Sequence, residues 1–152
     1  MAHSRPNSDN GELKMPMTIT QVHPDKLSTR RAKDGRILYS QVVEVKGSGR
    51  MIFLAGQVAR DAAGNNVGKG DMRAQIAQVG ENIKDALEAV GASLEDIVRT
   101  TTYVTDIDEY FKHADVRLRY FADAIPTSTT VEVRRLASPD NLVEIEAFAV
   151  SD

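Results

Sequence analysis

Hydrophobic and polar positions alternate along this chain with two different periods, which predict helices in some segments and strands in others. Apolar residues recur every third or fourth position after Asp71 and again after Asp106, so each segment is expected to form an amphipathic helix. The first stripe consists of Ile76, Val79, Ile83, Leu87 and Val90; the second consists of Ile107, Tyr110, Phe111, Ala114, Leu118 and Phe121. Asp71 is a suitable N-cap for the first helix, which Gly91 ends, and Pro126 ends the second.

Segments rich in β-branched residues predict the strands. They are Thr18–Val22, Leu38–Val45, Met51–Ala55, Ile97–Thr105, Thr127–Leu136 and Leu142–Val150. The glycines within residues 46–50 predict a hairpin turn between the second and third strands. The resulting element order predicts an α+β domain, in which two helices pack on one face of a mostly antiparallel sheet. Residues 1–16 are polar and are expected to form a disordered tail, which leaves 17–152 as a single domain.

The last predicted strand is partly apolar on both faces. Val143, Ile145, Ala147 and Ala149 share one face, and Leu142, Phe148 and Val150 share the other. Helices cover only one face of the predicted sheet, so the second apolar face favours an oligomer. The alternative is that these side chains are singly exposed.

The composition excludes several classes of function but does not identify one. The chain has 152 residues, of which 41% are hydrophobic and 27% charged, and these values are typical of a globular domain. A formal net charge of -3 argues against a dedicated nucleic-acid binder. The absence of cysteine excludes disulfides, thiolate metal sites and cysteine nucleophiles. No apolar run approaches the roughly 18 residues that cross a bilayer, and the polar N-terminus does not resemble a signal peptide, so cytoplasmic residence is expected.

General catalytic motifs are absent from the sequence. The segment 64–70 (GNNVGKG) lacks the spacing of a phosphate-binding loop. His3, His23 and His113 lack the spacing of zinc ligands, so no metal site is expected. His113 is either an acid or base, or a partly exposed helix residue.

Three glutamates in apolar strands are more informative. Glu144 and Glu146 lie on the same face of the last strand, and Glu132 lies on the preceding one. A carboxylate among packed residues requires pairing or hydrogen bonds. These residues therefore indicate either a functional site or a structural ion pair with Arg134 and Arg135.

Four segments carry a family resemblance. They are Met51–Val58 (MIFLAGQV), Ile97–Asp106 (IVRTTTYVTD), Val131–Leu136 (VEVRRL) and Val143–Ala147 (VEIEA). In order and spacing they resemble the Rid (YjgF/YER057c/UK114) family over residues 17–150. The resemblance implies a chorismate-mutase-like fold and a homotrimer with three clefts between subunits. It also implies hydrolysis of reactive imines and enamines to keto acids and ammonia, without a metal or organic cofactor.

The resemblance also implies site residues. Glu144 corresponds to the family's water-orienting glutamate, Tyr39 to a tyrosine that closes the site, and Gly56, beside Ala55, to the glycine at the strand end. Ser128 stands where the family has the arginine that holds the substrate carboxylate as a bidentate fork. Thr130 replaces a common cysteine, and Ala114 replaces an asparagine that lines the cleft.

The missing arginine makes the usual chemistry on small 2-imino acids doubtful and places the chain in an arginine-lacking subgroup. One hypothesis is that Arg36 or Arg31 supplies the charge; the alternative is that their loop is solvated. The first functional interpretation is a deaminase for a small imine, an enamine or an aminated ring-cleavage product. The second is a non-catalytic trimeric module that binds a metabolite or a partner protein, and a weaker third is an endoribonuclease.

Overall fold

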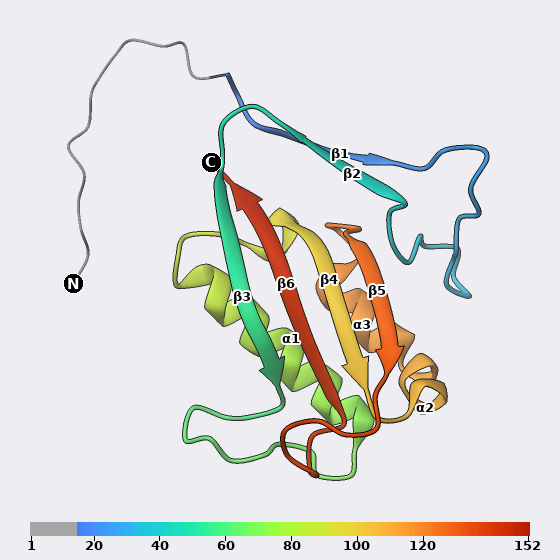
Figure 1. Cartoon of the computed structure of the whole chain (residues 1–152), viewed down its shortest axis with the longest axis vertical. Helices are drawn as coiled ribbons and strands as arrows, with labels where there is room; N and C mark the ends of the chain where they lie inside the picture. Colours follow the sequence, from blue (N-terminus) through green and yellow to red (C-terminus); the bar gives the residue numbers. More distant parts are fainter. Residues whose placement is uncertain (1–14) are drawn as a thin grey trace, which may run out of the picture.

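The computed structural model describes residues 15–152, so the predicted tail lies outside the described residues except for Met15 and Pro16. The elements are β1 (Thr18–Val22), β2 (Val42–Lys46), β3 (Arg50–Val58), α1 (Met72–Glu88), a 3-10 turn η1 (Leu94–Asp96), β4 (Ile97–Val104), α2 (Ile107–Lys112), α3 (Ala114–Phe121), β5 (Thr127–Glu132) and β6 (Val143–Ser151). Strands β3, β6, β4 and β5 form one sheet in that order, with the helices behind it in Figure 1. The predicted α+β fold is confirmed.

Pairing within the sheet is antiparallel except between β4 and β5, which run parallel. Helix α1 begins at Asp71, whose side chain accepts a 3.0 Å hydrogen bond from the Ala74 backbone, as predicted for an N-cap. Its apolar stripe packs on β3 and β6 to form the core. The fully buried members of that core include Ile76, Val79, Ile83, Leu87, Val143, Ile145 and Ala147.

The predicted hairpin between the second and third strands is wrong. β2 pairs over five residues with β1 in a separate two-stranded sheet, and β3 pairs with β6 (Figure 1). Residues 47–49 still form a turn, in which Gly47 has a φ of 89°. β-branched content predicts that a segment is extended, but it does not say which neighbouring edge will supply the hydrogen bonds.

The predicted second helix is two helices. His113, at φ -108° and ψ 28°, leaves the helical region between α2 and α3. The apolar stripe continues across the break, so periodicity alone does not detect it. After the break, Arg117 of α3 contacts β5, where it donates to the Ser128 hydroxyl at 3.3 Å.

One face of the four-stranded sheet is open and partly apolar. Met51 and Phe53 of β3 are 70% and 65% exposed, and Phe53 contacts Phe148 of β6 edge to face, with ring centroids 5.1 Å apart. The exposed apolar side chains of this face are therefore grouped rather than scattered.

Close approach of α3 to α1 depends on Gly80. A Cβ added to this glycine would lie 2.5–2.6 Å from ring atoms of Tyr120. We expect Gly80→Ala to lower the free energy of unfolding by about 1–3 kcal/mol, because the ring must move out of a packed contact. Urea denaturation measures this change.

Asp85→Ala on the exposed side of α1 is the matched control and should change stability by less than about 0.5 kcal/mol. Equal effects of the two substitutions would show that the helices do not rely on the contact at Gly80.

Candidate functional site

A cavity of about 320 Å³ lies where β5, the two short helices and the loop before β2 meet. Its wall consists of Arg30, Leu38, Tyr39, Tyr110, Phe111, Ala114, Arg117, Ser128 and Thr130. Four of the residues predicted from the sequence, namely Tyr39, Ala114, Ser128 and Thr130, therefore come together here. The wall combines apolar side chains, hydroxyl groups and two guanidinium groups.

Secondary structure explains why these side chains converge. Ser128 and Thr130 alternate along β5 and so share one face of the strand. Ala114 and Arg117 are three residues apart on α3 and share one face of the helix. The loop before β2 is held against them by Ser40, whose backbone N–H donates to the Pro126 carbonyl at 3.1 Å and whose hydroxyl donates to the Ile125 carbonyl.

The short connection between α3 and β5 is strained at one residue. Ile125 has a φ of 45°, the only positive value of a non-glycine residue in the described part of the chain. This conformation is unfavourable for a β-branched side chain. The two hydrogen bonds from Ser40 hold the connection, and through it they hold Tyr39 beside Ser128.

Arg117 is the buried charge of the cavity. The residue is only 8% exposed; one terminal nitrogen donates to the Leu38 carbonyl at 2.9 Å, and the other donates to the Ser128 hydroxyl oxygen at 3.3 Å. The guanidinium also lies over the Phe121 ring, 5.6 Å from its centroid. Among the described residues no carboxylate forms an ion pair with it.

Sequence reasoning missed Arg117, although a signal was present. It lies seven residues after Tyr110, three after Ala114 and four before Phe121, which are all members of the predicted apolar stripe. A charged residue within such a stripe is either buried with partners or functional.

Tyr110 contributes a second buried polar group. It is 2% exposed, and its hydroxyl lies beside the Thr102 hydroxyl and the Arg117 guanidinium without a well-formed hydrogen bond to either. Burial raises the pKa of the Tyr110 phenol, and the nearby Arg117 guanidinium opposes that rise. The phenol is therefore a neutral donor at neutral pH.

Glu144 lies on the open face of the sheet, away from this cavity. Its carboxylate packs against Gly56, where an added Cβ would collide with it. Beside it on β4, Tyr103 donates to Glu146 at 3.2 Å, and partial burial followed by the charge of Glu146 raises the pKa of Tyr103. The structure thus brings Glu144 and Gly56 together, but it does not bring them to Ser128 within one chain.

The remaining predicted residues lie outside both groups. Ala55 is exposed at the irregularity in β3, where its carbonyl accepts from the Gln57 side chain at 3.1 Å. Arg36 pairs with Asp34 at 2.7 Å and does not line the cavity, and Arg31 donates to the Gly35 carbonyl at 2.9 Å. The member of this loop that reaches the cavity is Arg30.

Of the two alternatives for the strand glutamates, the structural ion pair with Arg134 or Arg135 is not formed among the described residues. Glu132 instead accepts a hydrogen bond of 3.0 Å from the backbone N–H of Ile107, at the start of α2. In residues 15–152, no group of three or more His, Asp or Glu side chains could hold a metal ion. No helix in the same range is long and apolar enough to cross a membrane.

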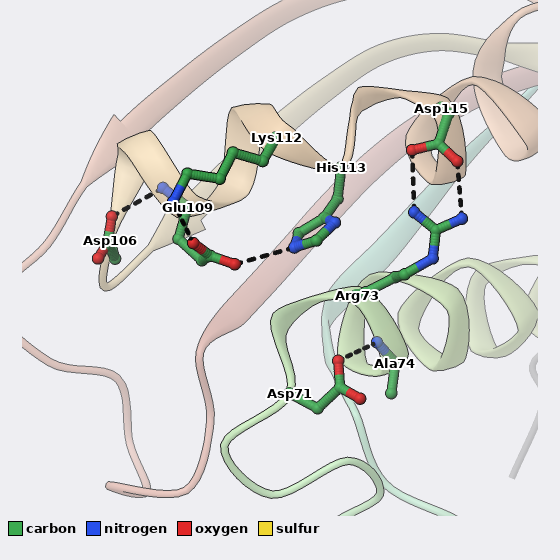
Figure 2. Close-up of polar contacts among 8 residues, drawn as sticks. All are labelled: Asp71, Arg73, Ala74, Asp106, Glu109, Lys112, His113 and Asp115. Atoms are coloured by element: carbon green, nitrogen blue, oxygen red, sulfur yellow. Dashed lines mark hydrogen bonds and ion pairs between the residues drawn. The ribbon is translucent and has the colours of Figure 1, made fainter.

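An ion pair fixes α3 against α1, and a second group of polar contacts lies within α2 and its C-terminal end (Figure 2). Arg73 of α1 holds Asp115 with two hydrogen bonds of 3.0 and 2.7 Å, and this contact lowers the pKa of Asp115. Glu109 accepts from Lys112 at 2.7 Å and contacts the His113 ring at 3.0 Å. His113 therefore belongs to this surface network and does not line the cavity.

Known proteins resemble the chain over most of its length. Residues 30–151 match the family model described as Endoribonuclease L-PSP. A RutC family protein of Pyrococcus horikoshii is 40% identical over 114 residues, which cover 75% of this chain and 87% of the relative. A 2-iminobutanoate/2-iminopropanoate deaminase of Bos taurus is 32% identical over 124 residues, 82% of this chain and 88% of the relative. The crystal structure of a Rid family protein from Yersinia pestis, 32% identical, superimposes with a TM-score of 0.74 and covers 86% of this chain and 97% of that one.

Proposed function

Because the chain belongs to the Rid (YjgF/YER057c/UK114) family, we propose that it is a deaminase that hydrolyses a small imine or enamine. Two relatives of about one-third identity, from Bos taurus and Dermatophagoides farinae, are named 2-iminobutanoate/2-iminopropanoate deaminases. The observation that carries the proposal is the cavity of about 320 Å³, whose wall combines an aromatic floor with hydroxyl and guanidinium groups. A space of this size and lining suits a small polar metabolite better than a nucleic-acid chain.

The proposed reaction is the replacement of a C=N bond by a C=O bond. Water adds to the imine carbon while Glu144 accepts one of its protons and passes that proton to the nitrogen, which gives a carbinolamine. The carboxylate then accepts the proton of the new hydroxyl group and passes it to the nitrogen as the C–N bond breaks, so that the C=O bond forms and ammonia leaves. An enamine first takes a proton on carbon to become the imine. One water is consumed and one ammonia is released, so the reaction needs no oxidant and no cofactor.

We propose that the two groups of site residues meet across a subunit boundary of a homotrimer. The cavity with Ser128 and the open-face pair of Glu144 and Gly56 belong to different surfaces of one chain. The exposed apolar side chains of Met51, Phe53 and Phe148 lie on the same open face as Glu144 and are suited to burial against a second copy. Sedimentation equilibrium measures the assembly, and a monomer at micromolar concentration would contradict this arrangement.

The activity can be tested on imines that are generated in situ in the assay. An amino-acid oxidase generates the imine continuously, and the purified chain should release ammonia and keto acid faster than spontaneous hydrolysis, in proportion to its concentration. Aminated ring-cleavage compounds belong in the same panel. Tight ligand binding without acceleration of any substrate would instead favour a non-catalytic binding module.

A further inference from the structure

We propose that Phe111 is a specificity-determining residue of the cavity and that its ring receives a flat aromatic group of the substrate. The substrate is then an imine or enamine that carries a planar ring. This inference rests on the proposed function and adds the part of the substrate that lies away from the reacting C=N bond. Its starting point is an exposed aromatic ring in the wall of the cavity.

Aromatic side chains are scarce in this chain and gather at the cavity. The chain has four tyrosines, four phenylalanines and no tryptophan. Three of these eight residues, namely Tyr39, Tyr110 and Phe111, belong to the wall, although the wall consists of only nine residues. A wall so rich in aromatic rings favours ligands that have a flat apolar surface.

Phe111 is the exposed member of an apolar stripe whose other members are covered. Its side chain is 57% exposed, whereas Tyr110 beside it is 2% exposed. Adjacent residues of a helix point in directions about 100° apart, so Phe111 is left at the opening of the cavity when Tyr110 enters the core. A large apolar side chain exposed at that place gains free energy when a ligand covers it.

The other two exposed phenylalanines belong to a different surface. Phe53 and Phe148 contact each other on the open face of the sheet, whereas Phe111 contacts Tyr110 on α2. The ring centroids of Phe111 and Tyr110 are 5.6 Å apart, and the rings are inclined by 63°. This edge-to-face contact holds the Phe111 ring in place while more than half of its surface stays exposed. The ring is therefore positioned before a ligand arrives.

The size of the cavity agrees with a ligand that carries a ring. Its volume of about 320 Å³ lies at the lower end of the range of small-molecule pockets, about 300–1,000 Å³. Such a volume suits one ring on a short chain. The hydroxyl groups of Ser128 and Thr130 lie on β5 and Phe111 lies on α2, so the polar part and the flat part of one ligand contact different elements.

Calorimetric titration of the full chain with two neutral ligands tests the role of Phe111 without requiring turnover. The ligands are 3-phenylpropanamide and 3-cyclohexylpropanamide, which differ only in whether the ring is flat. Burial of apolar area alone predicts equal or tighter binding of the cyclohexyl compound, because its surface is slightly larger. Contact between aromatic rings reverses this order, so the wild type should bind the phenyl compound about 3- to 10-fold more tightly.

Phe111→Leu keeps an apolar side chain and removes the ring, so the ratio of the two affinities should fall to about one or below, as apolar area alone predicts. Phe111→Tyr is the matched control, because it keeps the ring and should keep the ratio of the wild type. Both substitutions lie at an exposed position and should leave the fold intact, which circular dichroism checks. With imines generated in situ from phenylalanine and cyclohexylalanine, kcat/KM should show the same preference in the three proteins.

Tighter binding of the cyclohexyl compound by the wild type, or binding of neither compound, would overturn the inference. An unchanged ratio in Phe111→Leu would do the same; if this variant also assembles less well in sedimentation equilibrium, a second copy of the chain covers the ring instead. Preference for the flat ring without ammonia release supports the role of Phe111 and contradicts only the proposed reaction. Ammonia release without this preference contradicts only the role of Phe111.

Discussion

Glu144→Gln is expected to lower kcat for imine hydrolysis by about 100- to 10,000-fold, because an amide cannot accept the proton of the attacking water. The substitution keeps the size of the side chain and its packing against Gly56. The fold and the affinity for 3-phenylpropanamide should therefore change little. The measurement is the rate of ammonia release at saturating substrate, corrected for spontaneous hydrolysis.

Glu146→Gln is a demanding control for this experiment. Glu146 lies two residues away on the same strand and the same face, but it is occupied by the hydroxyl of Tyr103 at 3.2 Å. The two variants remove the same charge from nearly the same place, so an electrostatic effect on folding or assembly should be similar in both. A comparable loss of kcat in the two variants would indicate such a general effect and would argue against Glu144 as the proton acceptor.

The sequence predicts which face of its strand Glu144 occupies, but not how that face is oriented relative to the other site residues. Alternation along β6 predicts that Glu144 lies on one face of the strand and that Val143 and Ile145 lie on the other, buried face. The structure confirms this, since Val143 and Ile145 are buried and Glu144 is partly exposed. The sequence pattern does not show that Ser128 and Thr130 face the helices while Glu144 faces the other way. That difference follows from the register of β4 with β5 and β6, which depends on long-range pairing.

The source of positive charge in the cavity is not predictable from the sequence, as Arg36 and Arg117 show. The place of Arg36 near Tyr39 predicts a source of charge, but Arg36 makes a local pair with Asp34, two residues earlier in the same turn. Arg117 comes to Ser128 from α3, eleven residues earlier in the chain and on a different element. Its approach depends on the break at His113 and on the strained Ile125, and neither feature follows from hydrophobic periodicity.

The core positions are the most predictable part of the fold. The spacing of Val79, Ile83 and Leu87 alone predicts that they lie on the buried face of the first helix, and each is fully buried. A helix that packs on a sheet needs only a continuous apolar stripe, so local sequence determines this face. Strand pairing is less predictable, as β2 shows, because several edges accept the same extended segment.

Gln75 is a buried polar residue that joins α1 to the loop before β6. It is 0% exposed, and its side-chain nitrogen donates to the carbonyls of Gly68 at 3.0 Å and Asp140 at 2.7 Å. Its side-chain oxygen accepts from the Leu142 backbone at 2.8 Å. One side chain therefore contacts three backbone groups, of which those of Asp140 and Leu142 directly precede the strand that carries Glu144.

Gln75→Leu should lower the free energy of unfolding by about 2–4 kcal/mol, because it leaves the Leu142 N–H without a partner and removes one of the two donors from each of the Gly68 and Asp140 carbonyls. Gln78→Leu, three residues later on the same helix, is the matched control: its side chain donates only to Asn82 at 2.8 Å, and its loss should change stability by less than about 1 kcal/mol. Urea denaturation followed by circular dichroism gives both values. Because residues 138–142 lead directly into β6, hydrogen exchange in Gln75→Leu should increase first at Leu142 and the following residues. Uniform exchange across the sheet, or equal stability of the two variants, would show that the loop before β6 is held by other contacts.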